Sequence, residues 1–249
     1  MEAERAPTGQ RLLAAAVHAY TATGSVLALL MVHYSYRGDV ETVLWLFLAA
    51  MVVDGTDGFL ARRFRVKEVM PDFDGALLDN IVDYMTYTLA PMVLLWSNGY
   101  LPDGPLGGVL AAIPLLASCY QFCRSDAKTD DHFFLGFPSY WNVVAFYVIA
   151  TSLGTTTTAL ILVFFTIMVF VPIKYVHPSR TEPMWQLTFV LTALWFAAYA
   201  VIVAGLPDPS GPVIAASVGY LLYYSALSLW LTRQFPRRAA RAASAAASV

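Results

Sequence analysis

The sequence predicts an all-α fold, a polytopic membrane helix bundle of about eight transmembrane helices with both termini in the cytoplasm. Composition is the first reason, because 58% of the 249 residues are hydrophobic and only 13% are charged, which lies outside the usual range of soluble domains. The second reason is a series of eight apolar runs, each about as long as the 17–25 residues that cross a bilayer as a helix. The third is the placement of basic residues between these runs. Nothing in the composition indicates nucleic-acid binding.

The apolar runs can be placed in order from their length and from the turn residues between them. The first run follows a segment, residues 1–5, that lacks the basic region of a signal peptide, so we expect this run to remain as a span. The fifth run is the shortest, because Pro138 and Gly154 bracket it, and we expect it to tilt or to begin in the membrane interface. The runs lie near 12–34, 41–61, 77–97, 106–124, 138–153, 156–176, 184–204 and 212–232.

The connections between the runs are too short to fold alone. We therefore expect one transmembrane domain over residues 1–236. Residues 237–249 are rich in Ala and Arg, a composition typical of a flexible tail whose arginines lie near anionic head groups. Cys119 and Cys123 lie one helical turn apart without other metal ligands at a suitable spacing, which favours structural thiols.

The basic residues support the predicted topology. With eight spans and cytoplasmic termini, fourteen of the fifteen Lys and Arg residues fall on the cytoplasmic side and Arg37 falls outside, as the positive-inside rule requires. The end of the second run and the start of the third then face the cytosol. The cytoplasmic set is Arg5, Arg11, Arg62, Arg63, Arg65, Lys67, Arg124, Lys128, Lys174, Arg180, Arg233, Arg237, Arg238 and Arg241.

Four aspartates lie in or beside the second and third runs: Asp54, Asp57, Asp79 and Asp83. A helix turns about 100° per residue, so the first two share a face with Gly58 and Ala61, and the last two lie one turn apart on a second helix. An Asp in the membrane part of a helix costs roughly 2.5–3.5 kcal/mol, and carboxylates that face one another also repel. The four acids therefore predict a source of positive charge between the two helices.

Two divalent cations, with Arg62 beside them, are the simplest source of that charge. Mg²⁺ and Mn²⁺ take oxygen ligands, and hard cations of this kind commonly share them with substrate phosphates. The structural alternative is a set of carboxylates neutralised by protonation or by pairing between helices. Both interpretations stay open on the residues alone.

The spacing of these residues, D-x-x-D-G-x-x-A-R followed by G-x-x-x-D-x-x-x-D, resembles the signature of the CDP-alcohol phosphatidyltransferases. Eight specified positions are filled: Asp54, Asp57, Gly58, Ala61, Arg62, Gly75, Asp79 and Asp83. The resemblance implies a reaction between a CDP-linked lipid and an alcohol that gives a phosphodiester and CMP. It also implies a homodimer. By the same resemblance Asp54, Asp57 and Asp79 bind metal, and Asp83 contacts metal and takes the proton of the acceptor hydroxyl. Gly58, Ala61, Arg62 and Gly75 bind the CDP moiety.

Further segments resemble the branch of that family, found in bacterial inner membranes, that joins CDP-diacylglycerol to choline. They are residues 17–24, 66–71, 128–142 and 172–178. The first apolar run departs from the wider family because it lacks the Pro-Asn pair of other branches, which weakens assignment to those branches. The resemblance implies CDP-diacylglycerol, choline and membrane lipids as partners.

A quaternary ammonium is held by aromatic faces and carboxylates, which makes several aromatic residues candidates for an acceptor pocket. Ordinary membrane packing explains most of them equally well. The candidate head-group residues are Tyr84, Tyr87, Tyr120, His18, Arg124 and Lys128, with Phe122, Tyr140 and Trp141 as further aromatic residues near the same face. For His18, Thr21, Thr23 and Asn142 the default expectation is a hydrogen bond between helices.

Three alternatives remain at this point. A serine acceptor needs a partner for its carboxylate, and Arg124 is the obvious candidate. A phosphorylated acceptor needs a basic cluster, which Arg124, Lys128 and Lys174 could form. An ion-coupled transporter also carries buried acids, but no acid lies along the other six runs to line a path across the bilayer.

Overall fold

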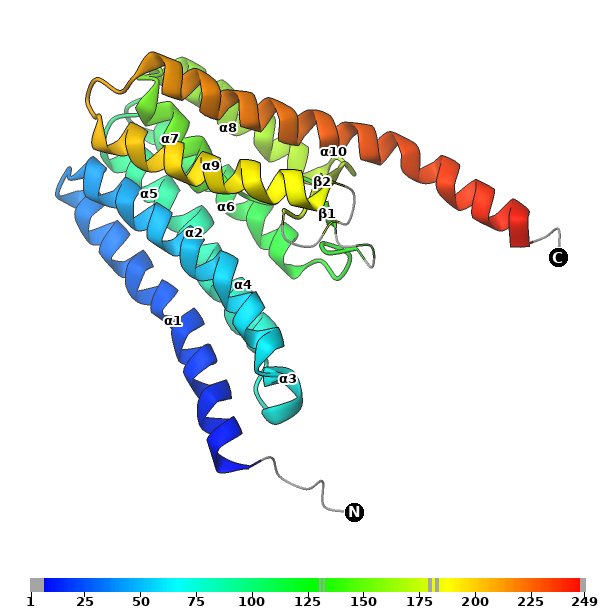
Figure 1. Cartoon of the computed structure of the whole chain (residues 1–249). Helices are drawn as coiled ribbons and strands as arrows, with labels where there is room; N and C mark the ends of the chain where they lie inside the picture. The colour runs from blue at the N-terminus through cyan, green and yellow to red at the C-terminus, as the bar shows by residue number, and fades with distance from the viewer. Residues whose placement is uncertain (1–6, 130, 132, 179–180, 182–183, 247–249) are drawn as a thin grey trace.

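The computed structural model describes residues 7–129, 131, 133–178, 181 and 184–246, with side chains as far as Gln234. Helices make up nearly all of it, and two short strands join near one end (Figure 1). The elements are α1 (Thr8–Tyr36), α2 (Val40–Arg63), α3 (Val66–Val69), α4 (Gly75–Asp83), the π-helical segment η1 (Tyr84–Leu89), α5 (Ala90–Ser97), α6 (Pro105–Cys123), β1 (Phe133–Leu135), α7 (Trp141–Ala150), α8 (Thr155–Phe170), β2 (Lys174–Val176), α9 (Trp185–Ala204) and α10 (Gly211–Ala246).

Every apolar run of the sequence contains a helix, and the chain is a polytopic membrane protein. In the part of the chain that the structure describes, five helices are long and apolar enough to cross a membrane: α1, α2, α6, α9 and α10. The third run is helical throughout, but α4, η1 and α5 follow one another there. The helices α7 and α8 are apolar but shorter. The count of eight spans therefore stays a prediction.

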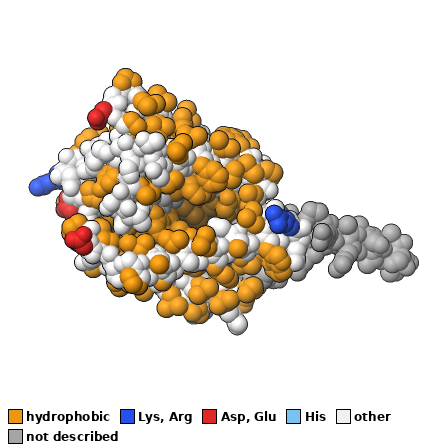
Figure 2. All heavy atoms as spheres, turned by 90° about the horizontal axis from the view of Figure 1, so that it is seen from above, with side chains coloured by type: hydrophobic (Ala, Val, Ile, Leu, Met, Phe, Trp, Pro, Cys, Tyr) orange, Lys and Arg blue, Asp and Glu red, His pale blue; other side chains and the backbone are white. Residues whose placement is uncertain are grey.

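Hydrophobic side chains cover most of the face seen in Figure 2, and charged side chains appear at its two ends. Large apolar side chains point outward on several helices, among them Leu29, Leu116, Leu160 and Leu222. A soluble protein rarely exposes so much apolar surface. The outer surface is thus suited to lipid.

The prediction of an all-α chain was wrong in one region. The sixth run was expected to stay helical to residue 176, but α8 ends at Phe170. Pro172 cannot donate a backbone hydrogen bond, and the residue before a proline avoids helical angles, so Val171 is extended. The chain then forms β2, which pairs antiparallel with β1.

The ribbon of β1 and β2 is fixed to α10 by side chains. Tyr224, Ser228 and Thr232 are spaced four residues apart and so lie on one face of α10. The Tyr224 hydroxyl donates to the Val176 carbonyl at 2.9 Å, and the Ser228 and Thr232 hydroxyls accept from the backbone amides of Val176 and Lys174 at 3.1 and 2.9 Å. The open edge of β2 is thereby satisfied.

Two predictions concern the chain ends. The helix α10 continues to Ala246, into the segment for which the sequence predicts a flexible tail, and the domain boundary at residue 236 stays a prediction. Arg5, Arg180 and His132, the last within the segment 128–142, lie outside the described residues.

The fifth apolar run is helical only over α7, and Ser139, just before this helix, has a φ of 61°.

The core of the bundle surrounds α7. Trp141 and Phe146 are fully buried, and the ring of Phe146 stacks on Tyr199 of α9 at 3.9 Å between ring centres. The Tyr199 hydroxyl donates to the Leu44 carbonyl of α2 at 3.0 Å. These contacts fix α2, which carries two of the four aspartates, against the rest of the bundle.

We expect Gly24→Ala to lower the thermal midpoint of the purified protein. A Cβ at Gly24 of α1 would overlap the Val82 side chain of α4, and a β-branched side chain cannot swing away easily. Overpacking of this kind costs about 1–3 kcal/mol. The matched control is Gly219→Ala on α10, where a Cβ meets nothing within 4 Å. Equal midpoints for the two variants in detergent would contradict this packing.

Candidate metal and nucleotide site

The structure brings the four aspartates of the motif together between α2 and α4. One carboxylate oxygen from each of Asp54, Asp57 and Asp79 lies within 4.8 Å of the others. Asp83, one turn beyond Asp79, lines the same small pocket. Residues of α1 close the pocket on the other side, among them Thr21 and Gly24. We call the four aspartates the acid cluster.

Three neighbouring side chains hold the acid cluster in place. Thr21 of α1 donates its hydroxyl to Asp57 at 2.7 Å, and Tyr87 of η1 donates its hydroxyl to Asp54 at 2.7 Å. The Lys128 ammonium lies 3.6 Å from an Asp79 oxygen. One lysine contact against four carboxylates leaves negative charge that further cations can balance.

The acid cluster fits a divalent cation by its chemistry. Its ligand atoms are all carboxylate oxygens, the type that Mg²⁺ and Mn²⁺ prefer. Three of them converge from two helices that are packed against α1. Hydrogen bonds from Thr21 and Tyr87 orient two of the three, as the outer partners of metal ligands commonly do.

The small residues of the motif lie where the sequence placed them, on the face that leads to the acid cluster. The Arg62 guanidinium folds back along α2, so that its Nη1 atom would lie 3.4 Å from a Cβ at Gly58. Ala61 is partly buried on the next turn, beside α3. The nearest side-chain atom to a Cβ at Gly58 thus belongs to Arg62, whereas Ala61 packs in the small apolar cluster of Ala14, Val17 and Val66.

Gly75 begins α4 beside the imidazole of His18. A Cβ at Gly75 would lie 2.7 Å from the His18 ring, which also packs on Phe73 at 4.2 Å between ring centres. The His18 Nε2 atom is buried and has no hydrogen-bond partner in the described part of the chain. Asp74 caps the helix by accepting from the amides of Ala76 and Leu77. The expected bond of His18 to another helix is therefore not present at Nε2.

The head-group candidates are separated by the structure. Tyr87 contacts the acid cluster. Tyr84 instead faces α6, where its hydroxyl donates to the Leu115 carbonyl at 3.3 Å and lies 3.4 Å from Cys119 Sγ. Tyr120 is exposed and packs on Phe170 of α8. Trp141 is fully buried, and its indole donates to Ser118.

The basic candidates pair with three different acids and do not form one cluster. Arg124 makes a two-point ion pair with Asp126, at 2.6 and 2.7 Å, and this hydrogen bonding lowers the pKa of the Asp126 carboxyl. Lys174 pairs with Asp131 at 2.9 Å. Burial alone would raise the pKa of Asp131, but hydrogen bonds from Thr129 and Lys174 hold it below its ordinary value.

The spacing of residues in the sequence did not reveal the hydrogen-bond partners of the polar residues inside the helices. Thr21 was expected to bond another helix, which is confirmed, but its partner proved to be the motif residue Asp57. Thr23 and Asn142 were expected to do the same, but among the described residues Thr23 donates to the Tyr20 carbonyl of its own helix and the Asn142 side chain accepts from the next amide, Val143. The sequence offered one indication of the Thr21–Asp57 bond: Thr21 lies one helical turn from His18 in the first apolar run.

The chain is similar to phosphatidylcholine synthases from several bacteria. It is 37% identical over 223 residues to that of Legionella pneumophila, covering 87% of each chain. It is 33% identical over 218 residues to that of Borreliella burgdorferi, covering 88% of this chain and 92% of the relative. It is 34% identical over 220 residues to that of Pseudomonas aeruginosa, covering 86% of this chain and 90% of the relative. No family model matches the chain. With relatives of this identity along most of its length, the chain belongs to the family of bacterial phosphatidylcholine synthases.

Proposed function

We infer that the protein is a CDP-diacylglycerol–choline O-phosphatidyltransferase, which transfers the phosphatidyl group of CDP-diacylglycerol to choline and releases CMP. The observation that carries this function is the consistent similarity to phosphatidylcholine synthases over 86–88% of the chain for three of these relatives. The acid cluster supports it, because a group of carboxylates beside a basic residue suits chemistry at a diphosphate.

Each residue of the motif has a proposed role in that reaction. Asp54, Asp57 and Asp79 would hold Mg²⁺ or Mn²⁺, with two ions shared by the full acid cluster. When bound, such cations neutralise diphosphate oxygens and the leaving group. Asp83 takes the proton of the choline hydroxyl as its oxygen forms the new bond to phosphorus and the bond from phosphorus to the CMP oxygen breaks. Proximity of Asp83 to the hydroxyl matters more here than its basicity.

The rest of the motif would bind the nucleotide. Gly58 leaves room along α2 except for the end of the Arg62 side chain, and Gly75 allows the His18 ring to approach the start of α4 closely. Ala61 is the second small residue of the motif on α2. The Arg62 guanidinium, which lies over Gly58, is suited to the diphosphate because arginine pairs with phosphate oxygens at two points.

Arg124 gives no support to a serine acceptor. Its guanidinium is engaged by Asp126 at two points, so it would have to leave one carboxylate to bind another. The basic cluster that a phosphorylated acceptor needs is likewise divided, because Lys128 and Lys174 pair with Asp79 and Asp131. Both observations favour an acceptor without a negative charge.

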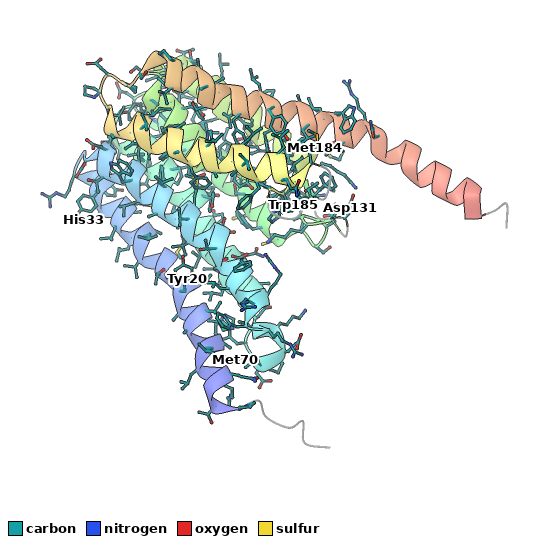
Figure 3. All side chains as sticks on the ribbon, viewed as in Figure 1. Tyr20, His33, Met70, Asp131, Met184 and Trp185 are labelled. Atoms are coloured by element: carbon teal, nitrogen blue, oxygen red, sulfur yellow. The ribbon has the colours of Figure 1, made fainter. Side chains whose placement is uncertain are left out.

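We also propose that the protein crosses the bacterial inner membrane eight times, with both termini and the acid cluster on the cytosolic side, and that it forms a homodimer. The distribution of basic residues supports the topology. Figure 3 places His33 near the turn after α1, whereas Asp131, and Trp185 at the start of α9, lie toward the opposite end of the bundle. The helices α2 and α6 both end away from the turn after α1, α2 beside α3 and α6 toward β1 (Figure 1). Labelling of single cysteines placed near Arg37 and Lys128 in intact cells tests the orientation.

The function is tested with purified protein in detergent, CDP-diacylglycerol, a divalent cation and labelled choline. We expect labelled lipid and an equal amount of CMP, both abolished by a chelator. Parallel reactions contain serine or glycerol 3-phosphate. Product from serine in place of choline would keep the transferase and discard the choline acceptor, and no CMP release with any alcohol would refute the transferase.

We expect Gly58→Ala to raise the KM for CDP-diacylglycerol about tenfold with little change in stability. In the structure a Cβ at Gly58 meets only the flexible end of Arg62, at 3.4 Å, so packing tolerates it. A methyl group would instead occupy the space of a bound nucleotide, and a misfit of this size costs about 1.4 kcal/mol. Gly55→Ala, on the same helix and with open space around it, is the control. An unchanged KM would show that Gly58 does not border the bound nucleotide.

A further inference from the structure

Beyond the acid cluster lies a row of aromatic rings contributed by different elements. Tyr87, bonded to Asp54, lies 5.9 Å from Tyr140 between ring centres. Tyr140 immediately precedes α7 and lies 6.4 Å from Phe134 of β1, edge to face. We call these three residues, Tyr87, Tyr140 and Phe134, the aromatic wall. His177, after β2, stacks on Phe134 at 4.9 Å.

The aromatic wall is built into the connection between α6 and α7. Phe134 pairs with Tyr175 of β2 in the ribbon and bridges to Lys128 in the preceding segment. The ribbon is itself fixed to α10 by the side-chain hydrogen bonds described above. The connection between α6 and α7 thus brings the Lys128 ammonium to Asp79 and the Phe134 ring to Tyr140.

The hydroxyl groups of the wall differ in their bonding. That of Tyr87 is occupied by Asp54, which fixes the ring. That of Tyr140 has no hydrogen bond to any residue that the structure describes. The side chain is only partly buried, and its oxygen is not one of the fully buried atoms that lack a partner, so water or a ligand can reach it. The wall therefore combines three neighbouring aromatic rings with one hydroxyl that has no partner among the described residues.

The acceptor's chemistry matches this arrangement. A quaternary ammonium has no hydrogen-bond donor and is held by aromatic faces, with attraction from carboxylates. In choline two carbons separate the nitrogen from the hydroxyl. When the choline hydroxyl lies at Asp83, the nitrogen must therefore also lie close to the acid cluster. The rings best placed to meet it are Tyr87, which bonds the cluster, and the rings that continue from Tyr87, namely Tyr140 and Phe134. Tyr84 and Tyr120 face other elements.

We propose that Tyr87, Tyr140 and Phe134 form the subsite for the trimethylammonium group of the acceptor, with His177 positioning Phe134. This inference rests on the proposed function and adds to it the residues that select a quaternary amine. Lys128 does not occupy the subsite, because its ammonium lies at Asp79.

The test measures KM and kcat for choline in Tyr140→Leu and Phe134→Leu. We expect KM for choline to rise about tenfold in each, about 1.4 kcal/mol, while the KM for CDP-diacylglycerol stays within about twofold. Tyr140→Phe keeps the ring and should keep most of the affinity. The control is Phe170→Leu, an exposed ring at the end of α8 that contacts Tyr120.

A neutral analogue separates attraction of the cation from a fit of shape. The alcohol 3,3-dimethylbutan-1-ol has carbon in place of the choline nitrogen. We expect the wild type to favour choline over this alcohol by about tenfold and the leucine variants to lose that preference. An unchanged preference, or an unchanged KM in both leucine variants, would overturn the subsite while choline transfer by the wild type still supports the function. If one leucine variant does not fold, the other carries the test.

Discussion

Asp83→Asn is expected to lower kcat for choline transfer by about 10²–10⁴-fold, the usual contribution of a general base. Asn has nearly the same shape as Asp, so the pocket between α1, α2 and α4 should keep its form, but its amide cannot take the proton of the choline hydroxyl. Asp83 lies in the acid cluster one helical turn beyond Asp79. We measure CMP release under saturating substrate.

A structural effect of this substitution must be separated from a chemical one. The KM for CDP-diacylglycerol should change little, because the proposed nucleotide contacts lie on other residues of the motif: Gly58, Ala61, Arg62 and Gly75. The melting curve should resemble that of the wild type. Activity within about threefold of the wild type would remove Asp83 from the reaction and leave it as a member of the pocket wall.

The second large effect is expected from Asp79→Asn, which should lower activity at least about 100-fold by removing a metal ligand. It should also change the response of stability to metal. A cation that binds the folded state raises the thermal midpoint, so Mg²⁺ should stabilise the wild type and a chelator should reverse this. The variant should show little of either effect.

Charge repulsion supplies a second readout for the same variant. Asp79 lies within 4.8 Å of Asp54 and Asp57, so without metal its replacement relieves repulsion and should leave the midpoint equal to or above that of the wild type. Asp208→Asn, in the connection before α10, is the control. A full Mg²⁺ shift in Asp79→Asn would show that Asp79 is not a ligand.

Sequence alone was sufficient for the membrane class and for the helix faces that carry the four aspartates. Hydrophobic runs long enough to span a bilayer have few alternatives to helices, because lipid offers no hydrogen-bond partner for the backbone. Carboxylates at i, i+3 and i, i+4 spacings then share helix faces. The helices follow from the lack of hydrogen-bond partners in lipid, and the shared faces of the acids follow from helix geometry within each segment.

Sequence patterns were less successful beyond residue 170. The apolar character of Val171, Ile173 and Val176 favoured a continued helix, whereas the chain leaves α8 and forms β2. The stabilising partners of β2 are β1 and a face of α10, which lie about 40 and 50 residues away in the sequence. Periodicity within one segment carries no information about such partners.

The sequence by itself determined that this is a polytopic membrane protein with four aspartates on two successive helices. Only the tertiary structure decided which side chains meet those aspartates. Thr21, Tyr87 and Lys128 reach the acid cluster from three different elements, while Arg124 and Tyr84 turn to other partners. The physical reason is that acid spacing is a property of one helix, whereas the neighbours of an acid depend on how all the helices pack.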